Sequence, residues 1–436
     1  MGSHRTVGGP LRPSHRRIRA HAPRYGRRRH EGRRSALQEG HHRQGGPIDG
    51  RRRGHVDARR LPGRPILPRV GRHIGEGVVI WPYIPFIVVA VLDIVLLVRY
   101  AAHERPVPPS RTGQRVSVII PAYNAQDTIS DTVASVLSSR GVHPEVIVVD
   151  DGSTDGTRDV ITAHGDDGAI LISQGHAGKW AALNNGVSHA TADAVVTLDA
   201  DTIVSPDTLR ILACALDDAD AVAGALMVER ESGLQNVIQR QEHVRIAMHR
   251  MVEGTVNTVS GPIAAFRRSV LEKHPFKASP VEDFEHTARL RGENARIAYA
   301  PAATGYTKMP TTWTNYWSQR LRWSVGTACE MRRLGLSRRG LVGGMAVSAL
   351  DIALVPLALW YHAYALLVLL ACIEGAIQVV GTRRERGGDE VAACAFYPQL
   401  VILACIALAT NITALAVSSS RKCNNYYKNN HDDAHE

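Results

Sequence analysis

Acidic residues follow two short apolar runs near the centre of the chain, where carboxylates could hold a metal ion and a diphosphate. Asp199 and Asp201 come directly after the run 194–198. Alternate residues of an extended chain point to the same side, so these two carboxylates can share one ion. Mg²⁺ and Mn²⁺ prefer oxygen ligands and keep phosphate or water in their shell, so two protein carboxylates suffice. The pattern predicts Mg²⁺ or Mn²⁺ here; a strand-terminal turn is the alternative.

A second set of residues could bind a nucleotide. Asp150 and Asp151 end an apolar run and precede a glycine turn, where one of them could accept a hydrogen bond from a uracil NH or a ribose hydroxyl. Pro121 and Tyr123 follow the preceding apolar run, and Tyr123 could stack on a base. Lys179 supplies a cation for phosphate. The alternatives are an Asp/Ser turn with a helix cap and a solvated lysine.

Glu282 and Asp283 precede a predicted helix, 284–291. Acids at a helix N-terminus are ordinary caps. An aspartate here could also take the proton from an acceptor hydroxyl as that hydroxyl attacks the anomeric carbon of a sugar. We expect Asp283 to be this general base in a single, inverting displacement, which requires no covalent nucleophile.

The segment Gln319-Arg320-Leu321-Arg322-Trp323 lies in a predicted amphipathic helix, 314–333, that is rich in tryptophan. A helix on the membrane surface would explain the Trp and Arg spacing without catalysis. As a functional segment, Gln319 and Arg322 would face a diphosphate and Trp323 would form a platform for a sugar near the acceptor.

Alternating strands and helices are predicted around these residues. The runs 116–120, 146–149 and 194–198 are typical of buried strands, and 127–139 has the apolar spacing of an amphipathic helix. We therefore predict an α/β domain over 112–335 with a mainly parallel, doubly wound sheet. Ligands bind outside the carboxyl ends of the strands in such sheets, where the acidic motifs lie.

Apolar segments flank this domain. The segment 78–100 is predicted to span a membrane, because its 21-residue apolar run is roughly 31 Å long as a helix and has aromatic and Arg anchors. The segment 341–380 predicts two helices joined near Trp360-Tyr361-His362, and 391–417 predicts a third. Asp93, Asp351 and Glu374 within these runs are typical of pairing or pathway residues, and no role is assigned to any of them.

The loop Arg383 to Arg386 places the central domain on the cytoplasmic side of a multi-pass plasma-membrane protein, because cationic loops favour the cytoplasm.

The net charge of +11 is concentrated at the N-terminus. Residues 1–80 contain 20 arginines, no lysine and five acidic residues, a net of +15, so the remainder carries −4. We expect residues 1–77 to be a disordered basic tail, or a stretch translated upstream of the true start. Residues 418–436 form a polar tail. The six cysteines show no Cys-x-x-Cys spacing, which indicates neither a disulfide framework nor a zinc site.

Four motifs occur in order along the chain: 148–153, 198–201, 282–283 and 319–323. Together they resemble the processive, membrane-embedded family 2 glycosyltransferases, which include hyaluronan, chitin, cellulose and poly-N-acetylglucosamine synthases. The resemblance covers about residues 80–420. It implies a GT-A fold, a UDP-sugar donor, Mg²⁺ or Mn²⁺, and inversion. It assigns Asp150 or Asp151 to the uridine, Asp199 to the nucleotide and Asp201 to the metal.

The same resemblance assigns Asp283 as the base, and it brings Gln319, Arg322 and Trp323 over diphosphate and acceptor. The segment 259–267 is similar to the acceptor-side loop of N-acetylglucosamine-using members, which favours UDP-N-acetylglucosamine over UDP-glucose. The chain departs from the pattern of this family in two ways. Val281 precedes the acidic pair, where Thr or Gly is commoner in the family, and the membrane part is small.

We therefore expect an inverting β-glycosyltransferase that extends a poly- or oligosaccharide on a carbohydrate or lipid-linked acceptor at the membrane. The alternatives are transfer of one sugar to a lipid carrier, an inactive membrane scaffold, and nucleic-acid binding by the tail. Nucleic acid is not an expected partner. Salt-sensitive binding of nucleic acid to the tail would prove little, because any polycation shows it. The sequence identifies no partner subunit.

Overall fold

The computed structural model describes residues 80–104, 111–165, 168–231, 233–254, 256, 258–259, 261–386, 398–419 and 423. The basic tail predicted over 1–77 lies outside these residues. So does most of the polar tail predicted over 418–436.

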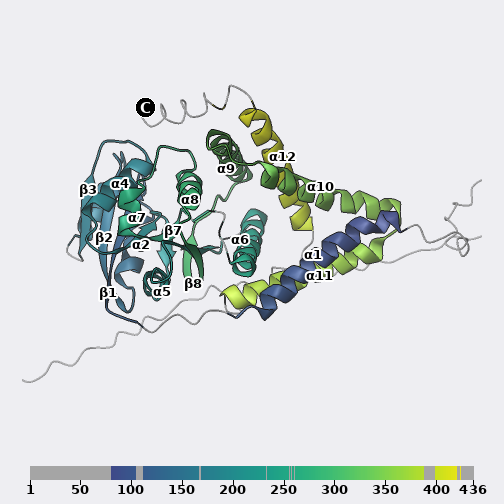
Figure 1. Cartoon of the computed structure of the whole chain (residues 1–436), viewed down its shortest axis with the longest axis horizontal. Coiled ribbons are helices and arrows are strands. Elements are labelled where there is room, and N and C mark those ends of the chain that lie inside the picture. Colours follow the sequence, from purple (N-terminus) through teal and green to yellow (C-terminus); the bar gives the residue numbers. More distant parts are fainter. Residues whose placement is uncertain are drawn as a thin grey trace, which may run out of the picture. The chain divides into compact units, whose positions relative to one another are not determined.

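One eight-stranded sheet forms the centre of the α/β domain (Figure 1), in the order β3-β2-β1-β4-β7-β6-β8-β5. Neighbours β3-β2-β1-β4 are parallel, as are β6 and β8, whereas β7 runs antiparallel to β4 and β6, and β5 antiparallel to β8. The sheet is thus α/β and mainly parallel, as predicted. Its strands are β1 (Gln114–Ala122), β2 (Val142–Asp150), β3 (Ala169–Ser173), β4 (Ala194–Leu198), β5 (Thr202–Val204), β6 (Ala221–Val228), β7 (Ile263–Arg267) and β8 (Ile297–Thr307).

Helices cover both faces of the sheet, because alternate residues of its inner strands are buried on opposite sides. Val118 and Ile120 of β1 pack in one cluster with α2 (Ile129–Leu137), α3 (Thr157–Ala163) and α5 (Thr208–Ala215). Ile119 lies in the other cluster, with α4 (Lys179–His189), α7 (Arg268–Lys273) and α8 (Glu282–Gly292). The two buried layers fix the strand ends that carry the acidic motifs.

Two longer helices complete the α/β domain. They are α6 (Leu234–Glu253) and α9 (Trp313–Arg333), and α9 is the helix predicted over 314–333. The side chain of Thr312 caps α9 by accepting a hydrogen bond from the backbone NH of Asn315 at 3.2 Å. This cap fixes the start of the helix that carries Gln319, Arg322 and Trp323.

Four helices among the described residues are long and apolar enough to cross a membrane. They are α1 (Ile84–Ala102), preceded by the 3₁₀ turn η1 (Trp81–Tyr83), α10 (Arg339–Trp360), α11 (Tyr364–Arg386) and α12 (Pro398–Ser418). The tight joint predicted near Trp360-Tyr361-His362 separates α10 from α11, and His362 has a left-handed backbone with φ of 55°.

An arginine of α6 pairs with the acidic residues of the apolar helices. The guanidinium of Arg245 lies 2.6 Å from Asp93 Oδ1 of α1 and 2.6 Å from Glu374 Oε2 of α11. Both carboxylates are buried. These two residues are therefore pairing residues, and α6 is joined to two of the apolar helices.

The cysteine spacing suggested no disulfide, and this expectation is wrong for one pair. Cys329 of α9 and Cys423, which lies 94 residues later in the chain, form a disulfide with a Cα–Cα distance of 5.8 Å. The spacing rule searches for cysteines that are close in sequence, whereas folding brings these two together. The bond attaches the segment after α12 to α9.

Candidate active site

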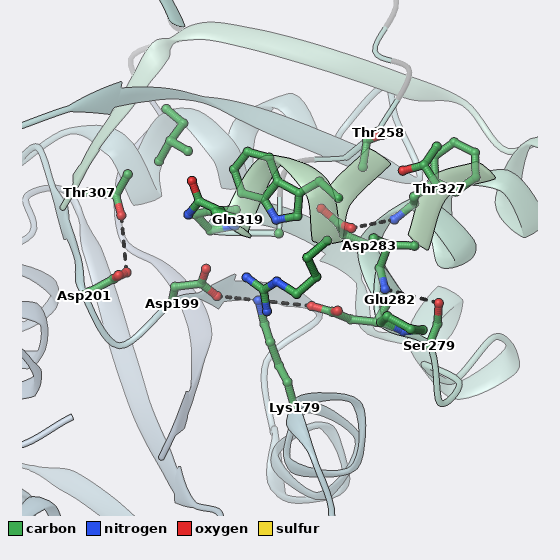
Figure 2. Close-up of a pocket in the computed structure, with 18 of the residues that line it drawn as sticks. Lys179, Asp199, Asp201, Thr258, Ser279, Glu282, Asp283, Thr307, Gln319 and Thr327 are labelled. Atoms are coloured by element: carbon green, nitrogen blue, oxygen red, sulfur yellow. Dashed lines mark hydrogen bonds and ion pairs between the residues drawn. The ribbon is translucent and has the colours of Figure 1, made fainter. Parts of the chain in front are cut away.

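A cavity of about 690 Å³ lies between the carboxyl end of β4 and helices α4, α6, α8 and α9. Figure 2 shows the side chains that surround it. Seven predicted site residues line it: Lys179, Asp199, Asp201, Asp283, Gln319, Arg322 and Trp323. Segments up to 144 residues apart in sequence therefore meet around one space. The other four predicted residues, Pro121, Tyr123, Asp150 and Asp151, lie outside this lining.

Lys179 lies between two carboxylates at one side of the cavity (Figure 2). Its Nζ is 2.6 Å from Asp199 Oδ1 and 3.1 Å from Glu282 Oε1. Burial disfavours the charged amine, but the charges of Asp199 and Glu282 outweigh burial, so the pKa of Lys179 lies above its usual range. Lys179 is a permanent cation at the N-terminus of α4, suited to contact a phosphate.

Asp201 lies beside Asp199 and accepts a hydrogen bond from Thr307 Oγ1 at 3.3 Å. Burial, followed by the charge of Asp199, raises the pKa of Asp201. Two neighbouring carboxylates in a cavity suit Mg²⁺ or Mn²⁺ with phosphate oxygens completing the shell. No group of three or more His, Cys, Asp or Glu side chains with metal-binding geometry occurs in the described part of the chain. The donor set therefore fits an ion that is shared with a substrate diphosphate.

Asp283 is in the first turn of α8, next to Glu282. Burial and then the charge of Glu282 raise the pKa of Asp283 to about 6, and Lys179 acts in the opposite direction. A Cβ at Gly261 would lie 3.2 Å from Asp283 Oδ2, so only a glycine leaves the present space in front of this carboxylate. An exchangeable proton near neutral pH and open space in front of the oxygen are the properties of a general base.

Glu282 belongs to the candidate site, although the sequence interpretation gave it no role of its own. It contacts Lys179 and lines the cavity. The signal in the sequence was present, because two adjacent acids start one helix, but only the structure shows that their side chains do different things. Glu282 holds the lysine and raises the pKa of Asp283.

The helix α9 contributes Gln319, Arg322 and Trp323 to the cavity. Arg320, which the sequence interpretation did not single out, forms a two-pronged ion pair with Glu242 of α6, at 2.6 and 2.5 Å. Its guanidinium carbon lies 5.0 Å from the ring centroid of Trp323. Arg320 thus covers one face of the tryptophan and joins α9 to α6.

Asp150 and Asp151 are buried and hold their own loops. Asp150 accepts hydrogen bonds from Ser153 N at 2.9 Å and from the guanidinium of Arg158 at 3.1 and 3.2 Å. Asp151 accepts from the backbone NH groups of residues 177 and 178 at 2.9 Å. Both carboxylates therefore order the loops beside the cavity, and the segment 177–178 held by Asp151 leads directly into Lys179.

Pro121 is near the end of β1, and Tyr123 comes directly after this strand. The ring of Tyr123 stacks on the ring of His176, with centroids 4.2 Å apart, and Tyr123 is 48% exposed. This exposed aromatic pair is a surface on which a base could stack. His176 was missed because a single histidine in a loop carries no pattern.

The helix α6 also lines the cavity, and the sequence interpretation missed it entirely. His243, Ile246, Ala247 and Arg250 contribute to the lining. Burial lowers the pKa of Arg250 relative to a solvated guanidinium. The available signal was a helix of low overall hydropathy with buried polar residues, which is typical of a helix that lines a polar cavity.

Comparison with known proteins covers the part of the chain that contributes Lys179, Asp199 and Asp201 to this site. The model of "Glycosyl transferase family 2" matches residues 117–274. The poly-β-1,6-N-acetyl-D-glucosamine synthase of Staphylococcus aureus strain MSSA476 is 30% identical over 240 residues, which cover 52% of this chain and 58% of that protein. The Staphylococcus epidermidis synthase is 29% identical over 225 residues, covering 48% and 54%. The chain spans little more than half the length of these relatives.

A solved structure shares the fold. A mannosyltransferase from Pyrobaculum calidifontis, in complex with GDP-Man and Mn²⁺, matches with a TM-score of 0.51 and 21% identity, over 77% of this chain and 97% of that one. Residues 117–274 therefore match the glycosyl transferase family 2 model, and the chain has the GT-A fold, as the resemblance of the motifs predicted.

Proposed function

We propose that this chain is an inverting β-glycosyltransferase that uses a UDP-sugar to extend a poly- or oligosaccharide at the cytoplasmic membrane. UDP-N-acetylglucosamine is the favoured donor. This choice is supported by the relatives, which are poly-β-1,6-N-acetyl-D-glucosamine synthases. The four apolar helices support the membrane location.

The observation that carries the proposal is the arrangement of carboxylates around one cavity. Asp199 and Asp201 lie at the end of β4, and Asp283 enters the same cavity from α8. The first pair suits the diphosphate of a donor. The third carboxylate has a pKa of about 6 and suits removal of a proton from an acceptor. A transferase needs both functions around one sugar.

In the proposed reaction, Asp283 takes the proton of an acceptor hydroxyl while the oxygen attacks the anomeric carbon of the donor. The bond from this carbon to the diphosphate oxygen breaks, and UDP leaves with the bonding electrons. One displacement inverts the anomeric carbon. Glu282 is held by Lys179, so it is not available as a second base.

Lys179 and Arg322 would contact the negatively charged diphosphate as it leaves. Asp199 and Asp201 would hold Mg²⁺ or Mn²⁺, and such an ion supplies positive charge that stabilises the departing diphosphate. Tyr123 would stack on the uracil, and Asp150 or Asp151 would position the uridine end through the loops that they order.

The other end of the cavity suits a sugar acceptor. Trp323 presents an aromatic ring with one face covered by Arg320, which leaves the other face for a sugar. Gln319 lies on the same helix. A platform that binds the growing chain favours repeated addition over transfer of a single sugar to a lipid carrier. The cationic segment 383–386 was predicted as a loop but forms the last turn of α11. Its positive charge at the end of an apolar helix supports a cytoplasmic position for the catalytic part.

UDP release tests the proposal. Membranes that contain the full chain are supplied with UDP-N-acetylglucosamine or UDP-glucose, and with Mg²⁺ or Mn²⁺. We expect release with the first donor, loss of release after chelation, and loss in Asp283→Asn. The length of the product, measured by mass spectrometry, separates chain extension from single transfer. The absence of UDP release with every donor and acceptor preparation would contradict the proposal and favour an inactive scaffold.

A further inference from the structure

We propose that Arg333 is a positioning residue that holds the base-bearing helix α8 against α9 and so fixes Asp283 relative to Gln319, Arg322 and Trp323. The inference rests on the proposed function, because it assigns Asp283 as the base. Arg333 is in the last turn of α9 and does not line the cavity. It acts through two buried carboxylates that the proposed reaction does not use.

The contacts of Arg333 cross from one helix to the other. Its Nη2 lies 2.5 Å from Glu330 Oε1 of α9 and 3.4 Å from Glu285 Oε1 of α8. Glu285 also accepts from Arg289 Nε at 2.9 Å. Both carboxylates are fully buried, at 0% exposure. We call Glu285, Glu330 and Arg333 the α8–α9 ion cluster.

The ion cluster also reaches the loop that leads into the base. Ser279 donates a hydrogen bond from its hydroxyl to Glu330 Oε2 at 3.2 Å, and the backbone NH of Val281 donates to Ser279 Oγ at 3.3 Å. Ser279 and Val281 line the cavity, and Val281 comes two residues before Asp283. Glu330 is therefore connected to the chain before Asp283 through Ser279, and to the chain after Asp283 through Arg333 and Glu285.

The two helices also touch closely at a glycine. A Cβ at Gly326 of α9 would lie 2.9 Å from Val281 Cγ1, a distance that real Cβ atoms essentially never show. This contact involves no charge, so it supports the close approach of α9 to the α8 entry independently of the ion cluster. Gly326 comes three residues after Trp323, so the contact lies beside the proposed sugar platform.

The Arg333 side chain is 43% exposed, whereas both carboxylates are buried, so we argue from the geometry that these ion pairs fix and not from the stability that they add. Apolar residues of similar volume can replace a buried ion pair at little cost, whereas removing one partner leaves a buried charge unpaired. Two carboxylates that share one guanidinium have a defined best orientation, which an apolar contact lacks. This orientation fixes how α9 is rotated against α8, and an error of about 1 Å in such a position can cost about a hundredfold in rate.

The test compares two adjacent arginines in the full-length membrane protein. Arg333→Met removes the link to Glu285 and Glu330, whereas Arg332→Met removes the same charge from a side chain that instead contacts the backbone oxygen of Ser418 at 2.5 Å. We measure kcat, the donor KM, and the ratio of free UDP to sugar transferred. For Arg333→Met we expect kcat to fall at least about tenfold and the donor KM to stay within about twofold. The fraction of UDP released without transfer should rise. Arg332→Met should behave as wild type.

Hydrogen exchange gives a readout that does not depend on activity. The peptide covering residues 279–290 should exchange faster in Arg333→Met and at the wild-type rate in Arg332→Met. If Arg333→Met does not fold, Gly326→Ala decides the question, because it separates the helices without removing a charge and should give the same loss of kcat at unchanged donor KM.

Unchanged exchange and unchanged kcat in Arg333→Met would overturn the positioning role, as would an equal effect of both arginine variants. A wild-type protein with no transfer activity but with the expected exchange difference would overturn only the proposed function.

Discussion

If Asp283 is the base, as proposed, it sets the acid side of the pH–activity profile. Its pKa is about 6, so with this value about 97% of the carboxyl is ionised at pH 7.5 and about 9% at pH 5. Only the ionised form can accept a proton, so activity is present above pH 6 and is lost as the pH falls through 6. We expect kcat/KM to drop about tenfold between pH 7.5 and pH 5. An aspartate of ordinary pKa would give almost no loss over this range.

The assay is UDP release at low donor concentration, at saturating Mn²⁺ and from pH 4.5 to 8.5, with protein stability checked at each end. Asp283→Asn should lower activity by about 10²-fold to 10⁴-fold and should abolish the acid limb in whatever activity remains. Glu282→Gln should shift the limb to lower pH, because the charge of Glu282 raises the pKa of Asp283. Glu293→Gln, an exposed residue that follows the same helix, is the control and should leave the limb in place. A wild-type profile that is flat down to pH 5, or an Asn variant that keeps the limb, would refute the assignment of the base.

Three further expectations follow from other contacts. Asp201→Asn should raise the Mn²⁺ concentration needed for half-maximal UDP release by at least about tenfold, because one of two carboxylates is lost; an unchanged Mn²⁺ curve would contradict the metal site. Trp323→Ala should shorten the products seen by mass spectrometry more than it slows UDP release, and unchanged product length would remove the platform role. Arg245→Met should lower the midpoint of thermal unfolding in detergent, because Asp93 and Glu374 lose their cation, at a cost of about 3 kcal/mol. The same midpoint should be partly restored when Asn and Gln replace these two acids, and no restoration would show that the pairing is not the cause.

Much of the fold was predictable because burial leaves a strong local pattern. The predicted strand 116–120 lies inside β1, and 194–198 coincides with β4, since apolar runs between turn residues are typical of inner strands. Helix α9 starts within one residue of the predicted helix. The strand β7 was not predicted, because the segment 259–267 was interpreted as a loop, and its antiparallel direction depends on long-range pairing.

Some residues of the candidate site were likewise predictable from the sequence, and others were not. Asp199, Asp201 and Asp283 were identified because carboxylates at the end of a strand and the start of a helix form a recognisable order. The internal hydrogen bonds of Asp151 and the pairing of Glu242 with Arg320 were not, because they join segments that are far apart in sequence. Contacts of this kind depend on the packing of whole helices, which no short motif encodes.

The helix α6 contacts both the cavity and two of the apolar helices. One of its faces borders the cavity through Ile246, Ala247 and Arg250, and Arg245 holds it to α1 and α11. Apolar helices tilt when the lipid bilayer is thinner than their hydrophobic length. A change in tilt would move Asp93 and Glu374, and through Arg245 it would move a wall of the cavity. If the apolar helices span a membrane as proposed, we expect the acyl-chain length of the surrounding lipids to change the turnover rate.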